Sequence, residues 1–376
     1  MKGKGESTRA AGTGLRVMIA GGGTGGHLFP GIALAEEVKA RGGEVVFVGT
    51  QRGIEARVLP EQGWPLELIE VSGIKGRGVR GLLTGLLRLP RAWWQSRAIL
   101  RRVRPDVVIG VGGYASGPIV ATASMMRIPT AIMEQNSIPG ITNRILARLV
   151  RRIFTSFDDL RGHFPKHKIV HAGNPIRRAL LERLQAGDDA GVDSGRGSAR
   201  LFVFGGSQGA RAINEQMLAA APGLMQALPG LEIWHQTGRA EHERVQQGYR
   251  ALGLEQVRVD GFINDMASAY RWADLVLCRA GATSVAELAA VGRPAVLVPF
   301  PHATDNHQEF NAQALVERGA AVLQRQSEWS TEGLSDTLLS LLGDRGRLAK
   351  MRSAMLDAAR PDAAARIFEE LAALRR

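Results

Sequence analysis

Two glycine-rich segments have the residue types needed to bind a phosphate or a sugar. The first, Gly21 to Gly26, follows an apolar stretch and ends at His27, where the pattern predicts the start of a helix. The second, Gly205 to Gly209, repeats the order of apolar stretch, two glycines, a hydroxyl residue and a glycine. Glycines let the backbone approach a ligand closely, and a following helix points its unpaired N–H groups at it. Two such segments predict two α/β halves and an enzyme that handles two substrates.

His27 is the candidate general base. An imidazole titrates near neutral pH, and we expect this position at the carboxyl end of a strand, where open α/β sheets bind ligands. A capping or packing role for the same histidine is the alternative, and the residues alone leave it open.

The second half of the chain has two further polar segments. Arg279 to Glu287 follows a buried strand and opens a helix, so its amides and hydroxyls can receive a phosphate. Glu287 is expected on the side of this helix that faces the ligand, where its carboxylate can accept two ribose hydroxyls; an ordinary solvated glutamate is the alternative. Pro299 to Asn311 concentrates amide and imidazole groups that can bind sugar hydroxyls.

Several common sites are excluded by what surrounds these segments. The glycines of Gly21 to Gly26 match a dinucleotide fingerprint, but the next strand, Glu44–Gly49, ends without the acidic residue that would hold a ribose. No Walker A lysine follows any glycine loop, and no Asp-x-Asp pair is present to clamp a metal-bound sugar nucleotide. We therefore expect no metal and no cofactor.

Composition predicts two domains and a reducing environment. The chain has 376 residues, which exceeds the usual size of a single core, and its one cysteine, Cys278, ends an apolar run and is expected to be a buried structural thiol. The first 14 residues are polar and are expected to form a disordered tail. No membrane-spanning helix is expected, because the uncharged stretch 107–126 is interrupted by glycines and Pro118.

Positive charge gathers between Val71 and Arg104, which contains nine basic residues and no acidic one, in a chain of net charge +12. Leucines and tryptophans are interleaved with these cations, which favours an anionic membrane surface. No nucleic-acid module accompanies the patch, so no nucleic acid partner is expected. A helix that packs on the sheet with a solvated basic rim is the alternative. The residues assigned to the membrane are Arg77, Arg80, Leu82, Leu83, Leu86, Leu87, Arg88, Arg91, Trp93 and Trp94.

Apolar runs alternate with helical stretches along the whole chain, which is typical of parallel α/β architecture with doubly wound sheets. The predicted strands are 16–20, 44–49, 106–111, 130–133, 152–155, 168–172, 201–204, 232–236, 257–259, 274–278, 295–298 and 321–323. We predict an N-terminal domain over 15–174, a hinge at Gly173–Pro175 and a C-terminal domain over 175–359. A C-terminal helix over about 360–376 is expected to pack back on the first domain, and 186–199 is expected to be a surface loop.

Eight motifs, in order, resemble those of the MurG family, bacterial glycosyltransferases that add N-acetylglucosamine to the lipid-linked muramyl-pentapeptide precursor of peptidoglycan. They are GGGTGGHLFPGIALA, GGYASGP, EQNSIPGITN, GNPIR, GGSQGA, GFINDM, CRAGATSVAE and PHATDNHQEFNA. The resemblance runs from about Leu15 to the C-terminal helix. It implies the GT-B fold, with two Rossmann-like domains separated by a deep cleft, and an inverting, metal-independent transfer. It also implies that the domain over 15–174 binds the acceptor and the membrane and that the domain over 175–359 binds the donor, UDP-GlcNAc.

The resemblance also implies roles for particular residues. Donor contacts fall on Thr24, Gly25, Gly26, Asn136, Arg177, Ser207, Ile263, Ala282, Thr283, Ser284, Val285, Ala286, Glu287, Gln308 and Asn311. Acceptor contacts fall on Gly22, Gly23, Gly112, Gly113, Tyr114 and Glu134. The glycine loops around Gly22, Gly112 and Gly205 would surround the acceptor diphosphate or the donor phosphates. This chain has Met133 where members often carry histidine, so any activation by that histidine would pass to His27.

The expected reaction moves GlcNAc from UDP-GlcNAc to the C4 hydroxyl of lipid I, undecaprenyl-pyrophosphoryl-MurNAc-pentapeptide, and gives lipid II for peptidoglycan synthesis. Such an enzyme would work at the cytoplasmic face of the bacterial inner membrane, held by anionic phospholipid. The alternatives are another GT-B enzyme, such as a diacylglycerol glycosyltransferase or a UDP-sugar epimerase, and a non-catalytic sugar-nucleotide-binding membrane protein.

Overall fold

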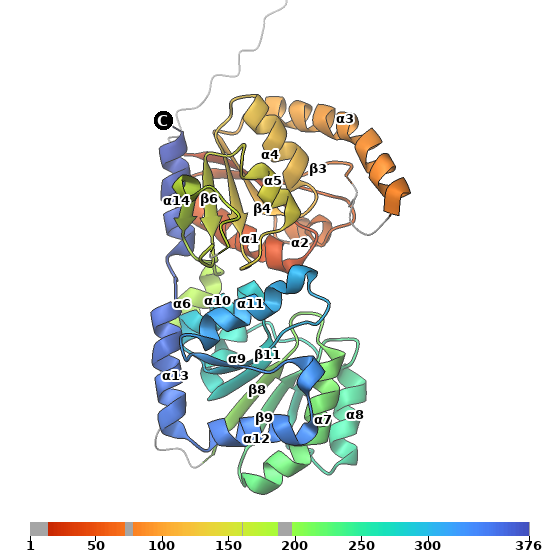
Figure 1. Ribbon diagram of the computed structural model, residues 1–376, viewed down its shortest axis with the longest axis vertical. Helices are drawn as coiled ribbons and strands as arrows, with labels where there is room; N and C mark the ends of the chain where they lie inside the picture. Colours follow the sequence, from red (N-terminus) through yellow and green to blue (C-terminus); the bar gives the residue numbers. More distant parts are fainter. Residues whose placement is uncertain (1–13, 72–77, 160, 187–197, 376) are drawn as a thin grey trace, which may run out of the picture. The chain divides into compact units, whose positions relative to one another are not determined.

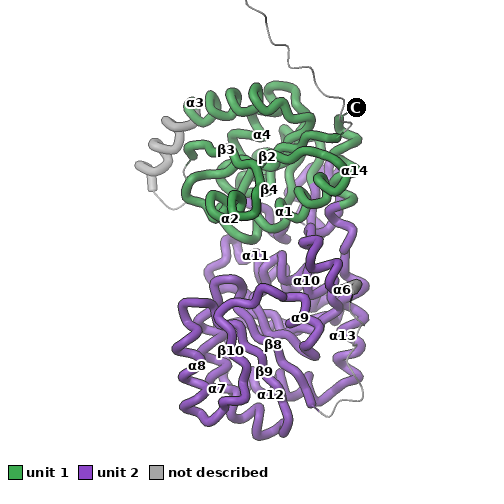
Figure 2. The backbone as a smooth tube through the Cα atoms, turned by 180° about the vertical axis from the view of Figure 1, so that it is seen from behind, with its two compact units in different colours: residues 1–133, 141–153, 365–376 green, residues 134–140, 154–364 purple. Residues whose placement is uncertain are grey.

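The structure is a computed structural model that describes residues 14–71, 78–159, 161–186 and 198–375, without the side chains of 78–89, 185 and 186. The predicted tail up to residue 13 and most of the predicted surface loop, 187–197, lie outside these residues. Contacts divide the chain into two compact units (Figure 2). Unit 1 contains residues 1–133, 141–153 and 365–376, and unit 2 contains residues 134–140 and 154–364.

The first half of the chain forms the first sheet and its helices (Figure 1). Its elements are β1 (Arg16–Gly21), α1 (Gly25–Ala40), β2 (Glu44–Gly49), α2 (Glu55–Glu61), β3 (Leu66–Leu68), α3 (Gly78–Val103), β4 (Val107–Gly112), α4 (Ser116–Met125), β5 (Thr130–Glu134), α5 (Ile141–Leu146), β6 (Arg152–Thr155), η1 (Lys166–Lys168) and β7 (Ile169–His171). The strand order is β3-β2-β1-β4-β5-β6-β7. In the parallel pairing of β1, Met18 lies opposite Val46 on one side and Val108 on the other. The order of the strands therefore reverses between β1 and β4.

The second sheet has the order β10-β9-β8-β11-β12-β13, with every neighbouring pair parallel. Its elements are α6 (Arg178–Ala186), β8 (Arg200–Phe204), α7 (Arg211–Ala227), β9 (Glu232–Gln236), α8 (His242–Ala251), β10 (Arg258–Asp260), α9 (Met266–Trp272), β11 (Leu275–Arg279), α10 (Ala282–Val291), β12 (Ala295–Val298), η2 (Thr304–Asn306), α11 (His307–Val316), β13 (Ala321–Leu323), η3 (Gln326–Glu328), α12 (Thr331–Leu342) and α13 (Arg345–Ala358). Here the order reverses between β8 and β11. The last helix, α14 (Ala363–Leu374), belongs to unit 1 from residue 365 on.

In the second sheet, alternate residues of the central strands β8 and β11 contribute to two separate hydrophobic cores. Phe202 and Cys278 face a core completed by α9, α10 and α11, whereas Val203 and Leu277 face one completed by α7, α8 and α12. Side chains of successive strand residues point to opposite faces of a sheet, so helices must cover both faces. This is the doubly wound arrangement that the sequence predicts.

The twelve predicted strands are all present, each within one residue of its predicted ends, and the buried thiol at Cys278 is confirmed. The prediction missed β3, which has only three residues, none of them buried. In unit 1, the helix α14 buries Ile367 and Leu371 completely, and its Glu370 pairs with Arg152 at 3.1 Å. Among the described residues, none of the helices is long and apolar enough to cross a bilayer.

Candidate functional site

Each sheet has a pair of polar loops at the point where its strand order reverses. In unit 1, Gly21–Thr24 follows β1 and Gly112–Tyr114 follows β4. In unit 2, Gly205–Gly209 follows β8 and Ala280–Gly281 follows β11. At such a point, the connections that follow two adjacent parallel strands run in opposite directions and leave a crevice at the carboxyl ends of the strands. Ligands of open α/β sheets bind in this crevice. Three of these loops carry predicted site residues, and the fourth leads directly into the predicted residues Ala282–Glu287 of α10.

The two glycine loops of unit 1 contact each other through their backbones. Gly22 N donates to Gly112 O at 3.2 Å, and a Cβ placed on Gly113 would lie 2.3 Å from Gly22 O. Gly23, Gly112 and Gly113 all have positive φ angles, between 81° and 96°. Only glycine fits such an approach in such a conformation, which explains the glycines at these positions.

His27 lies half-buried in the first turn of α1, at the edge of these loops. Its Nδ1 is 3.4 Å from both Gly22 O and Thr24 Oγ1. A Cβ on Gly112 would lie 2.8 Å from the His27 Cδ2 atom, so the ring packs directly on that glycine. Nearby in sequence, Tyr114 follows the second loop and is largely exposed. The structure thus brings the candidate base together with the predicted acceptor residues of unit 1, while Gly25 and Gly26 form the start of the same helix.

In unit 2, the Gly205–Gly209 loop is held by a residue that the sequence analysis missed. Gln236, at the end of β9, is 2% exposed; its Nε2 donates to Gly206 O at 3.1 Å, and its Oε1 accepts from Ile263 N at 2.9 Å. Gln236 therefore joins the loop that contains the exposed Ser207 to the segment that contains Ile263. The signal that could have identified Gln236 is its place in the sequence, since it is an amide residue at the carboxyl end of a predicted strand, β9, which neighbours β8 in the sheet.

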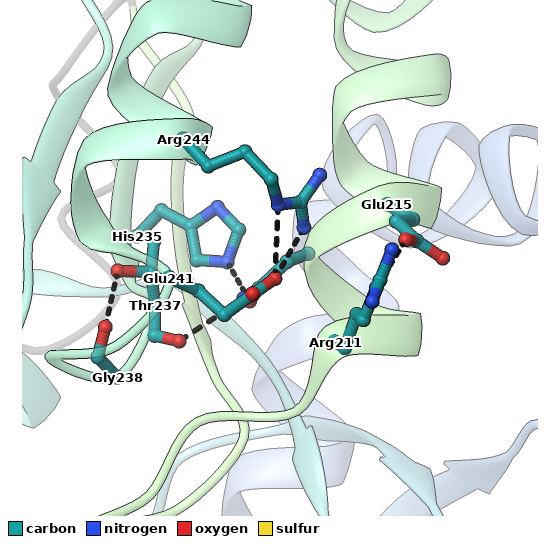
Figure 3. Close-up of polar contacts among 8 residues, drawn as sticks. Arg211, Glu215, His235, Thr237, Gly238, Glu241 and Arg244 are labelled. Atoms are coloured by element: carbon teal, nitrogen blue, oxygen red, sulfur yellow. Dashed lines mark hydrogen bonds and ion pairs between the residues drawn. The ribbon is translucent and has the colours of Figure 1, made fainter.

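A buried polar network contacts the same loop, and Figure 3 draws two of its residues, His235 and Thr237. His235 Nδ1 is 3.0 Å from the Tyr249 hydroxyl, and its Nε2 is 3.1 Å from Asn214 Oδ1. Asn214 Nδ2 donates to Thr237 O at 3.0 Å, the carbonyl against which Gly209 packs. Complete burial lowers the pKa of His235 to about 3, so the imidazole is neutral in the folded protein. Ion pairs of Arg211 with Glu215 and of Arg244 with Glu241 are drawn in the same view.

Glu287 is buried on α10 and is paired, which excludes an ordinary solvated helix glutamate. Its Oε2 accepts from the Tyr270 hydroxyl at 2.9 Å, and its Oε1 is 3.7 Å from Arg177 Nη2. Burial raises the pKa of the Glu287 carboxyl, while the Arg177 charge opposes that rise. The pKa of Tyr270 is also raised, first by burial and then by the Glu287 charge. Sequence reasoning found Glu287 and Arg177 but not Tyr270.

The helix α10 begins directly after Gly281, with Ala282, Val285 and Glu287 buried and Thr283, Ser284 and Ala286 partly exposed. The first amide groups of this helix therefore lie near the carboxyl end of β11, and their role in phosphate binding stays a prediction. It ends at Gly292, whose φ of 66° is a left-handed C-cap.

The loop 134–140 belongs to unit 2 and is fixed by two buried side chains. Glu134 accepts from Asn136 N and Gly140 N, both at 3.1 Å, so its carboxylate closes its own loop. Asn311 accepts from Ser137 N at 2.9 Å and donates to Asn136 Oδ1 at 3.3 Å and Ala280 O at 3.2 Å. This places Asn136 beside the start of α10. The assignment of Glu134 to the acceptor stays a prediction.

Two side chains of unit 2 form hydrogen bonds with the backbone of the polar loop that precedes α11. Gln308 Oε1 accepts from Phe300 N at 3.0 Å, and Arg279 Nη1 donates to Pro299 O at 2.9 Å. Asp305 and Asn306 both have a φ of 53°, a left-handed conformation that costs energy outside glycine. Among the residues that the structure describes, no group of three or more His, Cys, Asp or Glu side chains could hold a metal ion.

The predicted membrane segment is described in part. Arg77 lies outside the described residues, and so do the side chains of Arg80, Leu82, Leu83, Leu86, Leu87 and Arg88, whose backbone belongs to α3. Trp94 is 64% exposed and Trp93 is partly buried beside it. Arg91 is exposed and paired with Glu70 at 2.9 Å.

A second apolar surface in unit 1 was missed by the sequence analysis. Met125, Ile141, Ile145 and Leu149 are each between 47% and 70% exposed. The last three recur every four residues along α5 and beyond it, and Ser124 Oγ donates to Leu149 O at 3.2 Å, which joins the end of α4 to this stripe. Exposed arginines accompany it at 127, 148 and 151. We call Met125, Ile141, Ile145 and Leu149 the α5 surface.

These features define a two-unit sugar-nucleotide enzyme of the GT-B fold, as predicted. Residues 17–155 match the glycosyltransferase family 28 N-terminal domain, and residues 200–367 match the family's C-terminal domain. The chain belongs to glycosyltransferase family 28.

Two curated relatives and one solved structure illustrate the similarity. A protein of Anaeromyxobacter dehalogenans named UDP-N-acetylglucosamine--N-acetylmuramyl-(pentapeptide) pyrophosphoryl-undecaprenol N-acetylglucosamine transferase is 51% identical, over 94% of this chain and 92% of its own length. The protein of that name from Geobacter sulfurreducens is 47% identical, over 96% and 98%. The crystal structure of Acinetobacter baumannii MurG superposes with a TM-score of 0.79 at 31% identity, over 96% and 99%.

Proposed function

We propose that this glycosyltransferase moves GlcNAc from UDP-GlcNAc to the C4 hydroxyl of the MurNAc-pentapeptide of lipid I, which gives lipid II for peptidoglycan synthesis. The observation that carries the proposal is 51% identity along 94% of the chain to a transferase named for this reaction. The loops at both switch points support it, because they carry the residues that the resemblance assigns to the donor and acceptor.

His27 is the proposed general base. It would take the proton from the acceptor hydroxyl as that oxygen attacks the anomeric carbon from the face opposite UDP, which inverts the configuration there. Its half-buried position on Gly112, with Nδ1 directed to the Gly22 carbonyl and the Thr24 hydroxyl, supports this role because the ring is oriented by the loop. The glycine loops of unit 1 and Tyr114 would contact the acceptor.

Unit 2 is proposed to bind the donor. The start of α10, Ser207 and Arg177 would stabilise the diphosphate as it departs, since amide donors and a guanidinium can offset the negative charge that develops on it. Glu287 would accept the ribose hydroxyls, with Tyr270 and Arg177 holding its carboxylate. Because Ile263 N already donates to Gln236, the Ile263 carbonyl is the group left to bind the uracil. Gln308, Asn136 and Asn311 would position the sugar.

The test is transfer from radiolabelled UDP-GlcNAc to a lipid I analogue, with and without EDTA. We expect transfer in both conditions, because the proposed leaving-group stabilisation needs no metal. His27→Ala should lower kcat by about 10²–10⁴-fold with little change in donor affinity, the usual range for removal of a general base. His167→Ala, at an exposed histidine outside the proposed site, is the matched control.

Three outcomes would count against this function. Loss of activity in EDTA that added metal restores would contradict the metal-independent mechanism. Transfer to diacylglycerol, or epimerisation of UDP-GlcNAc, without transfer to lipid I would favour another GT-B enzyme. Tight UDP-GlcNAc binding with zero turnover would favour a non-catalytic binding protein.

The proposed location is the cytoplasmic face of the inner membrane, with anionic phospholipid as the partner. Two observations support it: the basic segment around α3, with its exposed Trp94, and the α5 surface with its neighbouring arginines. Large exposed apolar side chains beside cations fit the boundary between headgroups and acyl chains. Each nearby Lys or Arg adds about 1 kcal/mol of attraction to an anionic leaflet, so binding should weaken as salt rises.

Vesicle sedimentation tests this location. Replacing Arg77, Arg80, Arg88 and Arg91 by glutamine should release the protein from phosphatidylglycerol vesicles while UDP binding persists. A second variant, with Met125, Ile145 and Leu149 replaced by serine, should also be released, whereas Leu252→Ser, an exposed leucine of unit 2, should not. Sedimentation of both variants at the level of the unchanged protein would remove these surfaces as the membrane contact.

A further inference from the structure

Glu55, the first residue of α2, is a buried acid directly against the first glycine loop. It is 1% exposed. Its Oε2 accepts from Gly23 N at 2.7 Å, and its Oε1 accepts from Thr50 N at 2.9 Å and from Thr50 Oγ1 at 3.0 Å. Both oxygens thus accept hydrogen bonds from backbone amides, and burial keeps water from competing for them.

Three glycines leave the space that this carboxylate fills. A Cβ placed on Gly22, Gly49 or Gly53 would come within 2.4, 2.4 or 2.0 Å of the Glu55 side chain. Real Cβ atoms do not approach so closely, so each glycine is required for the acid to reach Gly23. The contact joins parts of the chain that are 32 residues apart.

The peptide that Glu55 contacts is the one that holds His27. Gly22 lies between them: its α-carbon faces the Glu55 carboxylate, while its carbonyl oxygen is 3.4 Å from His27 Nδ1. Gly22 N is used as well, as a donor to Gly112 O at 3.2 Å. A glycine segment has no side chain of its own to fix its conformation, so an external group must select one.

We infer that Glu55 is a positioning residue for His27: by holding the Gly22–Gly23 segment, it sets the direction in which the imidazole points. The inference rests on the proposed role of His27. It also restricts the first glycine loop, because the Gly23 amide donates to the Glu55 carboxylate and cannot at the same time donate to a phosphate.

Glutamine in place of Glu55 is the sharpest perturbation. An amide keeps the size of the side chain but replaces one acceptor oxygen by a donor, and each oxygen of Glu55 faces a backbone N–H. In either orientation of the glutamine amide, its NH2 group faces the backbone N–H of Gly23 or of Thr50, so that two donors face each other. Glu55→Gln should lower kcat by about 10²-fold, the loss that a misplacement of about 1 Å can cause, with KM for UDP-GlcNAc unchanged. Glu61→Gln, at the exposed end of the same helix, is the control.

A double-mutant cycle separates positioning from a general loss of structure. If Glu55 acts through His27, Glu55→Gln should cost nothing further in a His27→Ala background, because the group it positions is gone. UDP affinity and thermal unfolding of each variant report whether unit 2 and the whole chain remain folded. Thr50→Val, which removes only the hydroxyl donor, is a milder second variant and should lower kcat less than Glu55→Gln.

The outcomes distinguish this inference from the proposed function. A His27→Ala variant with unchanged kcat would overturn both. A strongly impaired His27→Ala beside a fully active Glu55→Gln would overturn only the positioning role. Multiplicative losses in the double variant, or a rise in KM for UDP-GlcNAc with kcat unchanged, would also overturn it.

Discussion

Acid should destabilise this protein through His235, the buried histidine of unit 2. The imidazole is fully buried, with its two nitrogens 3.0 and 3.1 Å from Tyr249 and Asn214, and burial lowers its pKa to about 3 from the ordinary 6.5. In the unfolded chain the same ring binds a proton at about pH 6.5. The unfolded state therefore binds more protons below that pH, so stability is lost as the pH falls from about 6.5 toward 3.

The size of the effect follows from the two pKa values. A pKa lowered from 6.5 to about 3 corresponds to about 5 kcal/mol in total, since one pKa unit is about 1.4 kcal/mol. Between pH 6.5 and 4.5, this one group should remove about 2–3 kcal/mol of unfolding free energy. His235→Gln keeps a polar side chain that does not titrate, so the unfolding free energy of this variant should fall less steeply as the pH is lowered. The slopes of unfolding free energy against pH should differ between the two proteins by the binding of about one proton.

The assay is urea unfolding followed by tryptophan fluorescence at several pH values from 7.5 to 4.5, since Trp234 neighbours His235 in β9. Carboxylates and other histidines titrate alike in both proteins and cancel in the difference. His302→Gln, an exposed histidine, should follow the unchanged protein. Parallel curves for the unchanged protein and His235→Gln, with a constant difference across pH, would refute the reasoning.

Three further predictions concern the donor. Glu287→Ala should weaken UDP-GlcNAc binding through lost ribose hydrogen bonds, each contributing about 1.5–3 kcal/mol, whereas an unchanged Kd by calorimetry would remove Glu287 from ribose binding. Gln308→Ala should relax discrimination among UDP-hexoses more than it weakens UDP itself; competition titrations that find selectivity intact would exclude it from sugar recognition. Gln236→Leu should raise the Kd for UDP, because both Gly206 O and Ile263 N lose their partner; equal affinities would mean that those loops hold without it.

Much of the fold could be predicted because it is a local property of the sequence. Parallel strands buried on both faces form continuous apolar runs, which is why β4 or β12 is visible without a structure. The glycine loops were predicted for the same reason, because a run of glycines directly after an apolar strand can be recognised from neighbouring residues alone. The strand β3 was missed because its three residues are only partly buried or exposed and have no such pattern.

The supporting residues of the site could not be predicted in this way. Tyr270 meets Glu287 across 17 residues, and Glu55 meets Gly23 across 32. In sequence, Glu55 lies between charged residues and resembles any solvated glutamate; only the fold shows that three glycines make room for it. The α5 surface was hidden similarly, because Ile141 falls within the motif EQNSIPGITN, which the resemblance connects with ligand contact through Glu134 and Asn136.

The division of the chain into units has a consequence for how the protein is made. Unit 1 is assembled from three stretches, the last of which is 365–376, so its sheet gains α14 only after all of unit 2 has been synthesised. During translation, the surface that Ile367 and Leu371 later bury is therefore uncovered while some two hundred intervening residues emerge. A ribosome that stops after Ala364 would release a complete second unit joined to a first unit that still lacks part of its core.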